Sequence, residues 1–486
     1  MVLGVVEPKK EKKERDFSQW YDWILERAEI YDYGRYPVKG MGIWLPYGFQ
    51  IRKRTMDLMR DLLDSRDHEE ILFPLLIPKW MLEKEGEHIK GFENEVFWVT
   101  YGGTEELDQK LALRPTSETI ITYYESLWYQ SYKQLPKKLY QIVSMFRYET
   151  KATRPLIRLR EVTSFKEAHT IHDSFDSAEN QIKEAIDIYK KFFDELGIPY
   201  IISKRPDWDK FAGALYTIAF DTIMPDGRTL QIGTVHHLGQ SFSKAFNYKI
   251  QLRDESFDHP WQTSYGISDR VIATIISVHG DDNGLVLLPS IAPIQVIIVP
   301  IPSSNESETQ SIMEYSKNML NKLTESKIRC KIDDRPDLTP GEKYYYWEAK
   351  GVPIRIEIGL RELRNHNITI VRRDTLERKV VEENNAIKEI GLILENIRNN
   401  LYEKAWKNLE QKIYEVDNLK EAKDYINKKG IVEIPWCGKE TCANKIMEEL
   451  EAKSLGTPWP SKKLSGKKCP ICGERAFTVM RYARQY

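Results

Sequence analysis

One uncharged segment strongly limits how this chain can fold. Residues 284–305 contain no Asp, Glu, Lys or Arg and include two strongly apolar runs. Four prolines interrupt the segment: Pro289, Pro293, Pro300 and Pro302. Because proline removes a backbone donor and blocks the continuation of a helix, we do not expect a membrane-spanning helix here. The segment is predicted to be a domain junction that leads into a buried strand at residues 295–299.

Length and composition indicate a globular protein with several domains. The chain has 486 residues, more than one hydrophobic core usually serves, so we expect two or three domains. Its 41% hydrophobic and 30% charged residues argue against wholesale disorder. The 72 basic and 73 acidic residues leave a net charge of −1. A nucleic-acid partner would therefore have to be bound by local basic patches.

The N-terminus bears on localisation. Residues 1–6 contain no apolar stretch long enough for a signal peptide, and a charged run follows at residues 9–15. We interpret that run as a solvated tail, although its basic side chains could also contact phosphates. The prediction is a cytoplasmic protein with no membrane partner.

Strands, turns and amphipathic helices are expected before the junction. Residues 48–67 repeat apolar side chains at helical spacing, and residues 71–77 suit an edge strand because Pro74 lies within them. Further strands that could pair antiparallel are predicted at 138–148, 156–168 and 229–235. Further helices are predicted at 178–197 and 270–279. This pattern predicts an α+β fold, an antiparallel sheet with flanking helices.

After the junction, strands and helices alternate. Strands are predicted at 295–300, 328–333, 354–358 and 368–372. Helices are predicted between them at 308–325 and 341–350. This order favours a second, α/β domain, and a helical stretch at 382–413 leads to a third region. The predicted domains are 1–288, 289–398 and 399–486.

The first of four chemically suggestive motifs is the sequence Leu-Arg-Pro-Thr-Ser-Glu-Thr, which begins at Leu113. It places the hydroxyl of Thr116 close to the carboxylate of Glu118. Similar patterns cap the beginning of many helices, and the two interpretations are compatible.

The second motif is Phe-Arg-Tyr-Glu at residues 146–149, followed by a loop rich in arginine. Alternation along a strand places Arg147 and Glu149 on one face. If a returning strand pairs with it, Arg158 or Arg160 could converge on that face. Guanidinium groups suit phosphate oxygens, so the cluster could hold a triphosphate. A surface ladder of salt bridges with neighbouring glutamates is the alternative.

The third motif is Gln-Ile-Gly-Thr-Val-His-His-Leu-Gly-Gln, which begins at Gln231. On a regular strand, Gln231 and Val235 share one face, while Thr234 and His236 share the other. His236 and His237 would point to opposite sides, so we do not expect them to bind one metal ion. One core histidine and one exposed histidine is the plainer interpretation.

The fourth motif, Gly-Ile-Ser-Asp-Arg, begins at Gly266 and opens the predicted helix at 270–279. A glycine turn, a cap at Ser268 or Asp269, and Arg270 in the first turn describe a helix start that faces an anion.

Taken in this order, these motifs resemble those of the class II aminoacyl-tRNA synthetases. The helix at 48–67 with Pro74 resembles the first, dimer-forming motif. Phe-Arg-Tyr-Glu with its arginine loop resembles the second, and Gly-Ile-Ser-Asp-Arg the third. The first and third sequences described above are similar to prolyl-tRNA synthetases in particular. So are several second-domain positions: Asp334-Arg335-Pro336, Gly341, Trp347-Glu348 and Lys350-Gly351-Val352-Pro353. The resemblance covers nearly all of residues 17–486.

The resemblance implies that ATP activates L-proline to prolyl-adenylate, which is then transferred to the 3′ end of tRNA(Pro). The residues implied for proline are Thr116, Glu118, Arg147, Glu167, His169 and His236. Those implied for ATP are Arg147, Glu149, Arg158, Gln231, Thr234 and Arg270. Arg147 and Arg270 would be catalytic, and Mg²⁺ would assist at the pyrophosphate. A homodimer is also implied.

Two regions distinguish the chain within the wider family. The interval from His169 to Arg270 is already taken up by the catalytic sheet, so no editing domain is expected there. The C-terminal extension places the chain in the archaeal and eukaryotic-like branch.

In the second domain, Glu348 and Lys350 are candidates for anticodon contacts, because a single-stranded anticodon offers exposed base edges.

Four of the five cysteines lie close to the C-terminus. Cys437 and Cys442 form one pair, and Cys469 and Cys472 form the second. Paired cysteines with short spacers in a cytosolic protein fit a tetrahedral structural Zn²⁺ site. Disulfides or a redox pair are the alternatives. Cys330 stands alone and is expected to be a small buried hydrophobe.

Two other functions remain possible from the residues alone. One is a class II enzyme for threonine, serine or glycine. The other is a non-catalytic paralogue that binds RNA, although such proteins tend to lose the arginines found here at 147 and 270.

Overall fold

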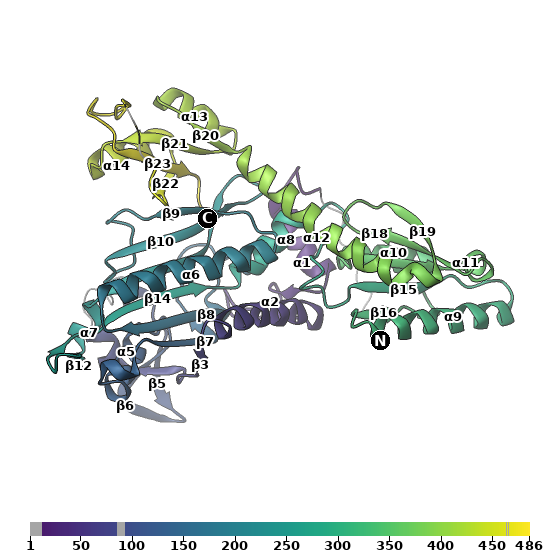
Figure 1. The fold of residues 1–486 in the computed structure, drawn as a ribbon, viewed down its shortest axis with the longest axis horizontal. Coiled ribbons are helices and arrows are strands. Elements are labelled where there is room, and N and C mark those ends of the chain that lie inside the picture. Colours follow the sequence, from purple (N-terminus) through teal and green to yellow (C-terminus); the bar gives the residue numbers. More distant parts are fainter. Residues whose placement is uncertain (1–11, 85–92, 463, 465) are drawn as a thin grey trace.

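The computed structural model describes residues 12–84, 93–462, 464 and 466–486. Residues 1–11, on which the prediction about a signal peptide rests, lie outside this part. An eleven-stranded sheet dominates the molecule, in the order β20-β21-β23-β22-β9-β10-β11-β14-β8-β7-β3 (Figure 1). The predicted α+β class is confirmed.

Long antiparallel strands form the middle of this sheet: β7 (Lys137–Phe146), β8 (Glu161–His172), β14 (Trp261–Ile267), β11 (Thr229–Gly239), β10 (Tyr216–Ile223) and β9 (Ile201–Lys204). The helices of this part are α1 (Phe17–Arg27), α2 (Pro46–Asp64), α3 (Lys79–Glu83), α5 (Glu118–Trp128), α6 (Phe175–Glu195), α7 (Ser241–Ala245) and α8 (Arg270–His279). Shorter strands are β1 (Tyr31–Asp32), β2 (Ile43–Trp44), β3 (Glu69–Glu70), β4 (Leu76–Pro78), β5 (Trp98–Gly102), β6 (Glu105–Leu113), β12 (Ile250–Gln251) and β13 (Phe257–Asp258).

Two strand predictions need correction. The strand expected at 71–77 was expected to be broken by Pro74, and the chain does form β3 and β4 on either side of this proline, which cannot donate to a ladder. Its expected extent is wrong, because residues 71–75 belong to neither strand. The strand expected from residue 156 begins only at Glu161. Arg154 and Arg158 first close a tight turn, in which each amide N–H donates to the other residue's carbonyl oxygen at 2.9 Å.

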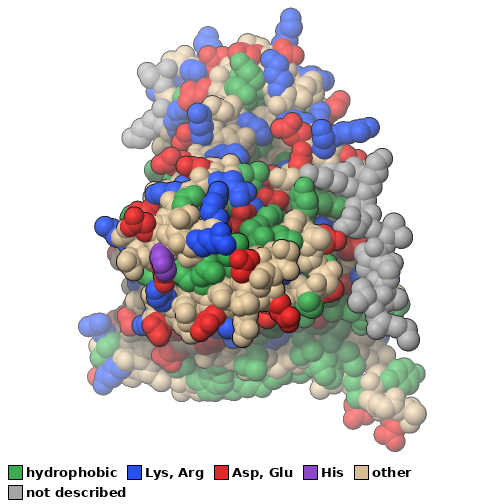
Figure 2. Space-filling view, turned by 90° about the vertical axis from the view of Figure 1, so that its right-hand side faces the viewer, with side chains coloured by type: hydrophobic (Ala, Val, Ile, Leu, Met, Phe, Trp, Pro, Cys, Tyr) green, Lys and Arg blue, Asp and Glu red, His purple; other side chains and the backbone are tan. Residues whose placement is uncertain are grey.

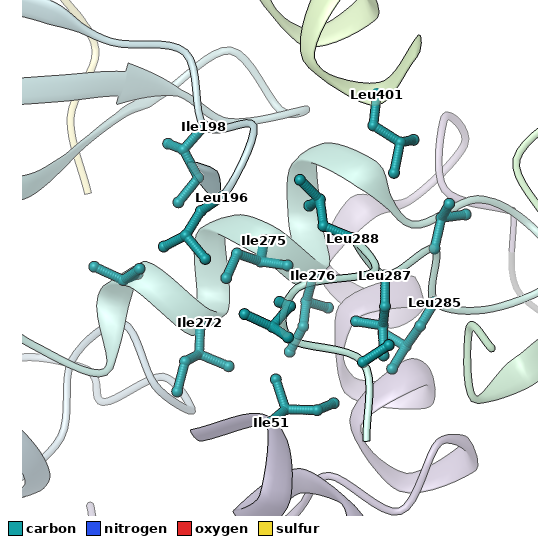
Figure 3. Packing of buried hydrophobic residues seen from close by; sticks show 14 of the residues in the cluster. Ile51, Leu196, Ile198, Ile272, Ile275, Ile276, Leu285, Leu287, Leu288 and Leu401 are labelled. Carbon is teal, nitrogen blue, oxygen red and sulfur yellow. The ribbon is translucent and has the colours of Figure 1, made fainter. Parts of the chain in front are cut away.

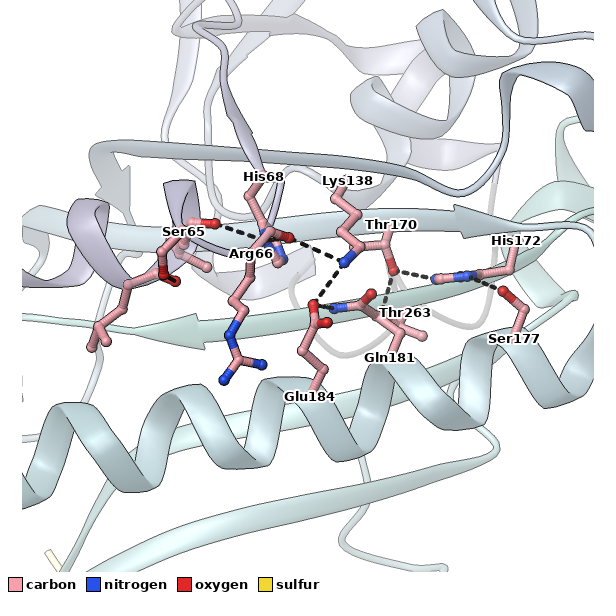
Figure 4. Close-up of polar contacts among 12 residues, drawn as sticks. Ser65, Arg66, His68, Lys138, Thr170, His172, Ser177, Gln181, Glu184 and Thr263 are labelled. Carbon is pink, nitrogen blue, oxygen red and sulfur yellow. Dashed lines mark hydrogen bonds and ion pairs between the residues drawn. The ribbon is translucent and has the colours of Figure 1, made fainter.

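Alternation along β8 separates a structural face from a functional face. Helix α6 lies along one face of the sheet (Figure 1), and Lys166 of β8 donates from that face to the Tyr189 hydroxyl at 2.9 Å. Lys138 Nζ donates to Glu184 Oε1 at 2.8 Å and to the Arg66 carbonyl at 3.1 Å (Figure 4). These contacts tie the end of α2 and α6 to the sheet. The opposite face remains open for a binding site.

The uncharged segment is buried at the junction. Ile272, Ile275 and Ile276 of α8 pack against Leu285, Leu287 and Leu288, with Ile51 of α2 and Leu401 close by (Figure 3). Fully burying each such side chain contributes about 1.5–3 kcal/mol. The segment is thus part of a core shared by neighbouring domains. Among the described residues, no helix is both long and apolar enough to cross a membrane.

A second sheet has the order β16-β15-β17-β18-β19, formed by β15 (Val296–Pro300), β16 (Cys330–Ile332), β17 (Ile354–Ile358), β18 (Asn367–Arg372) and β19 (Arg378–Glu382). Strand β15 pairs in parallel with β16 and β17, as an α/β unit requires. The accompanying helices are α9 (Glu306–Glu325), α10 (Pro340–Ala349) and α11 (Leu360–Arg364). Strand β19 and helix α11 were not predicted. Seen end-on, this domain mixes Lys and Arg with Asp and Glu (Figure 2).

The C-terminal region continues the main sheet, which the sequence did not predict. Helix α12 (Ala386–Glu410) runs back from the second sheet (Figure 1). The following elements are β20 (Ile413–Glu415), α13 (Leu419–Asn427), β21 (Ile431–Trp436), α14 (Glu440–Leu450), β22 (Lys453–Pro458) and β23 (Thr478–Ala483). Strand β22 pairs with β9, with Thr457 opposite Lys204. The boundaries at 288/289 and 398/399 stay predictions.

Candidate active site

A cleft of about 300 Å³ opens on the face of the sheet opposite α6. Most of the residues proposed for substrate binding line it, namely Thr116, Glu118, Arg147, Glu149, Arg158, Glu167, Gln231, Thr234, His236 and Arg270. They come from the ends or faces of several strands, from the turn before α5 and from the start of α8. The structure therefore brings together residues that are far apart in the sequence.

Carboxylates occupy one part of the cleft. Glu118 is the first residue of α5 and is only 6% exposed. The Thr116 hydroxyl donates to Glu118 Oε2, and Ser264 Oγ donates to Oε1 at 3.4 Å. The motif does begin a helix, but its cap residue Ser117 accepts a hydrogen bond from Gln141 Nε2 at 3.2 Å. Ser117 therefore occupies the N-cap position of α5, but its side chain forms no capping hydrogen bond with the helix.

The second carboxylate, that of Glu167, is positioned by neighbouring side chains. Gln141 Nε2 donates to Glu167 Oε1 at 2.6 Å, and His169 Nε2 lies 3.4 Å from Glu167 Oε2. Burial alone would lower the pKa of His169, but the hydrogen bond and charge of Glu167 outweigh it and raise the pKa. Of these residues, Glu167 lines the cleft, whereas His169, two residues further along β8, contacts Glu167 without lining it. His169 can thus shape the pocket indirectly.

Arginines occupy the adjoining part. Arg147 Nε donates to the Pro115 carbonyl at 3.1 Å, and Arg270 Nε donates to the Ile157 carbonyl at 2.9 Å. Burial and then the positive charges of Arg158 and Arg147 lower the pKa of Arg270 to about 10. Burial likewise lowers the pKa of Arg147, although nearby glutamates oppose this. Several guanidinium groups that line one cleft create a strong site for an anion.

From the sequence, either Arg158 or Arg160 could face the cleft, and the structure decides between them. Arg158 lines the cleft, and Arg160 does not. The Arg160 guanidinium lies 4.0 Å from the centre of the Tyr148 ring and donates to the Glu149 carbonyl at 3.2 Å. Asp269 occupies the N-cap position of α8, as expected, but its side chain forms no capping hydrogen bond. It accepts from the Thr163 amide at 2.9 Å and so ties that helix to β8.

The expected alternation along β11 is wrong at one point. Phe220 of β10 lies opposite Gly233, yet the next residue, Asp221, lies opposite Gln231. Ile232 is therefore the extra residue of a β-bulge, which redirects the neighbouring side chain. As a result Gln231 lines the cleft together with Thr234 and His236.

The plainer interpretation, one core and one exposed histidine, is wrong, because the side chains of both His236 and His237 are buried, on opposite faces of β11. His236 Nδ1 lies 2.9 Å from the Thr217 hydroxyl, and its ring faces the cleft. His237 is fully buried on the other face, where its ring stacks on Phe175 at 5.2 Å.

The four C-terminal cysteines converge. The sulfur atoms of Cys437, Cys442, Cys469 and Cys472 all lie within 4.8 Å of one another. Cys437 Sγ and Cys472 Sγ are 3.6 Å apart, close to the edge of a tetrahedron whose metal–sulfur bonds are about 2.3 Å. All four are free thiols, which disagrees with disulfides. Cys330 is half-buried in β16, and the expectation of full burial is wrong.

The two anticodon candidates occupy different surroundings. Lys350 is 4% exposed, and its Nζ donates to Glu29 Oε2 of the first domain at 2.6 Å. This position at the junction between domains does not favour contact with a base, so Lys350 is better explained as a structural link. Glu348 is half-buried, with its carboxylate 3.9 Å from the Arg355 guanidinium, and stays a prediction.

Known proteins match every part of this architecture. Residues 97–279 match the tRNA synthetase class II core domain (G, H, P, S and T), residues 295–391 an anticodon binding domain, and residues 419–486 the prolyl-tRNA synthetase C-terminal domain. Proline–tRNA ligase of Aeropyrum pernix is 59% identical over 481 residues, which cover 99% of both chains. The chain belongs to the prolyl-tRNA synthetase family.

Other family members agree in sequence and in structure. Proline–tRNA ligase of Sulfolobus acidocaldarius is 60% identical over 479 residues, 98% of this chain and 99% of that one. A Giardia lamblia prolyl-tRNA synthetase in complex with prolyl-adenylate superposes with a TM-score of 0.95 at 36% identity, covering 98% of this chain and 100% of that chain. The enzyme from Cryptosporidium parvum, complexed with halofuginone and AMPPNP, gives 0.93 at 32% identity, with 98% and 96% covered.

Proposed function

We propose that this chain is a proline–tRNA ligase that forms prolyl-adenylate from L-proline and ATP and transfers the prolyl group to tRNA(Pro). The observation that carries the proposal is the division of one cleft into a carboxylate part and an arginine part. A cationic imino acid and a triphosphate can bind there side by side.

Glu118 is the residue proposed to balance the positive charge of proline. Its carboxylate is buried beside the Thr116 hydroxyl, so both can accept hydrogen bonds from the imino nitrogen. Glu167, held by Gln141 and supported by His169, closes the pocket behind. His236 completes the proposed proline site on the β11 side.

Arg147 is proposed to bridge the proline carboxylate and the α-phosphate of ATP, because it lines the cleft close enough to both Glu118 and Arg270 for their charges to interact. Arg158 and Arg270 would hold the outer phosphates, with Gln231 and Thr234 against the rest of the nucleotide. A carboxylate oxygen of proline attacks the α-phosphorus, and pyrophosphate leaves. The tRNA 3′-terminal hydroxyl then attacks the carbonyl carbon, and AMP leaves. Catalysis rests on positioning and charge stabilisation.

Two metal ions fit the residues present. Mg²⁺ prefers oxygen ligands and binds largely through phosphates and water, so Glu149 at the arginine part is a sufficient protein ligand. When bound, it would neutralise charge on the outer phosphates of ATP. Zn²⁺ fits the four convergent thiols, whose saturated shell would give it a structural role.

The exposed surface around β4 supports a homodimer. Large apolar side chains are exposed there, namely Leu72 (78%), Leu75, Leu76 and Trp80. A second copy that covers them would remove this apolar area from water. Sedimentation equilibrium that finds only monomers would contradict this part of the proposal. Cytoplasmic localisation also remains a proposal.

Replacing the arginines tests the proposed site directly. Arg147→Ala and Arg270→Ala should each reduce ATP–pyrophosphate exchange with proline by at least about 100-fold, as is usual for a lost charge-stabilising donor. Arg160→Ala is the matched control, because Arg160 belongs to the same motif and lies outside the cleft. Near wild-type exchange in either of the first two variants would refute the assignment.

A further inference from the structure

Arg205 is a buried arginine that belongs to none of the motifs. It follows β9, is only 5% exposed, and borders the cleft. Its Nη2 donates to Asp221 Oδ1 at 2.8 Å and to Gln231 Oε1 at 3.0 Å. Its Nη1 donates to the Leu455 carbonyl of β22 at 2.6 Å. One guanidinium thus connects the C-terminal region to a residue of the proposed ATP site.

This contact determines which way the Gln231 amide points. A guanidinium group has donors and no acceptor, so only the amide oxygen of Gln231 can face Arg205. The amide nitrogen, with its two hydrogens, is then directed away from Arg205. Since Gln231 lines the cleft, the structure presents a hydrogen-bond donor to whatever binds there. Without such a partner, the two ends of an amide are nearly interchangeable.

The Arg205 guanidinium is itself fixed by Asp221 and by the Leu455 carbonyl. Asp221 is fully buried and lies directly opposite Gln231 across the β-bulge, so it supplies the counter-charge. The Leu455 carbonyl is fixed by the close approach of β22 to β9. Gly456 there has φ of +96°, and a Cβ at that position would lie 2.2 Å from the Lys204 carbonyl oxygen. Only glycine permits this approach.

We propose that Arg205 is a positioning residue for ATP: it holds the Gln231 amide so that its NH₂ group donates to an acceptor atom of the bound nucleotide. The proposal rests on the function proposed above, because it takes Gln231 to contact ATP. It also implies that ATP binding depends on the docking of the C-terminal region, through the Leu455 carbonyl. Direct contact between Arg205 and the nucleotide is the competing explanation.

Steady-state ATP–pyrophosphate exchange with single and double variants separates these explanations. Gln231→Glu keeps an oxygen toward Arg205 and replaces the donor that faces the cleft with an acceptor. Arg205→Lys keeps the positive charge beside Asp221. An ammonium group lacks the planar guanidinium that donates to the Leu455 carbonyl, Asp221 and Gln231 at once. Each should raise the KM for ATP about tenfold, the effect of one hydrogen bond, and change the KM for proline less than about twofold.

The double variant provides the decisive comparison. If Arg205 acts through Gln231, then Arg205→Lys added to Gln231→Met should raise the KM for ATP no further than Gln231→Met alone. Multiplicative effects would show that Arg205 contacts the nucleotide itself, and they would overturn the proposal. So would an unchanged KM for ATP in Arg205→Lys.

A matched control separates positioning from general stability. Arg481 joins the same two regions, with Nη1 donating to the Ile202 carbonyl at 2.7 Å, but it does not border the cleft. Arg481→Lys should lower Tm without raising the KM for ATP. An equal rise in that variant would contradict a specific role for Arg205. If Gln231→Met leaves the KM for ATP unchanged, the proposed role of Gln231 fails as well, whereas a wild type that shows no exchange with proline would refute the proposed function itself.

Discussion

Glu118 combines burial with a position in the wall of the cleft. Thr116 and Ser264 each donate a hydrogen bond to its carboxylate. An ionised carboxylate only accepts hydrogen bonds, so it suits a cationic nitrogen. Because the site is shielded from water, such a charge-assisted bond is worth about 1.5–3 kcal/mol. This residue is therefore where the positive charge of proline should matter most.

Glu118→Gln should raise the KM for proline about 10- to 100-fold and leave the KM for ATP within about threefold, because the substitution removes only the counter-charge. Exchange kinetics with each substrate varied in turn would measure this. Glu125→Gln is the matched control on the same helix, because Glu125 does not line the cleft and burial raises its pKa to about 7, which leaves it only partly charged near neutral pH. Damaged ATP affinity with intact proline use would overturn the role of Glu118.

The orientation of Gln231 and the contacts of Arg205 could not be predicted from the sequence. Most of the substrate-binding residues proposed from the sequence do line the cleft, because the chemistry of the motifs is local in the sequence. The bulge at Ile232 depends on how β10 pairs with β11, and regular alternation could not anticipate it. Arg205 belongs to no motif, and its partners lie in β10, β11 and β22. Only the folded sheet brings them together.

At the scale of elements, helices were predicted better than short strands. Helix α8 was predicted with its observed bounds, and α10 differs by one residue at each end. Periodicity and capping are properties of adjacent residues, which explains this success. Strands such as β3 and β19 are short and defined by their partners, so they have little local signal.

The two cysteine-bearing segments pack around a small cluster of their own. Cys437 follows β21, Cys442 lies in α14, and the second pair lies on a tight turn that precedes β23. Purified protein should contain about one zinc per chain, because the four sulfur atoms converge on one position. Binding of the ion by four thiolates should also stabilise the local fold.

Cys437→Ser and Cys472→Ser should abolish zinc binding and lower Tm, and Cys330→Ser should do neither. Metal analysis and thermal unfolding would measure these effects. A wild type that is folded, soluble and free of zinc would refute the site.

At the scale of the molecule, the main sheet runs without a break from β20 to β3. The residues between His169 and Arg270 form the end of β8, then α6, α7, β9 to β14 and their connections. They are thus used by the main sheet and the elements around it, as expected, and the absence of editing stays a prediction. Pairing of β22 with β9 joins strands hundreds of residues apart, so the sequence pattern could not indicate it.

This architecture predicts limited fidelity. Alanine and cysteine are no larger than proline, so the pocket cannot exclude them by size. Lost apolar contacts discriminate by only about 1–3 kcal/mol, or roughly 10- to 200-fold. The chain should therefore activate alanine or cysteine measurably and leave alanyl-tRNA(Pro) intact. Rapid enzyme-dependent deacylation of pre-made alanyl-tRNA(Pro) would reveal an editing site.

The most direct test of the central claim is ATP–pyrophosphate exchange by the full chain with a panel of amino acids. Proline should give the highest kcat/KM, because the carboxylate and arginine parts of the cleft are arranged for a cationic imino acid beside ATP. Alanine and cysteine should follow at roughly 10- to 200-fold lower values. Faster exchange with threonine, serine or glycine, or no exchange with any amino acid, would contradict it.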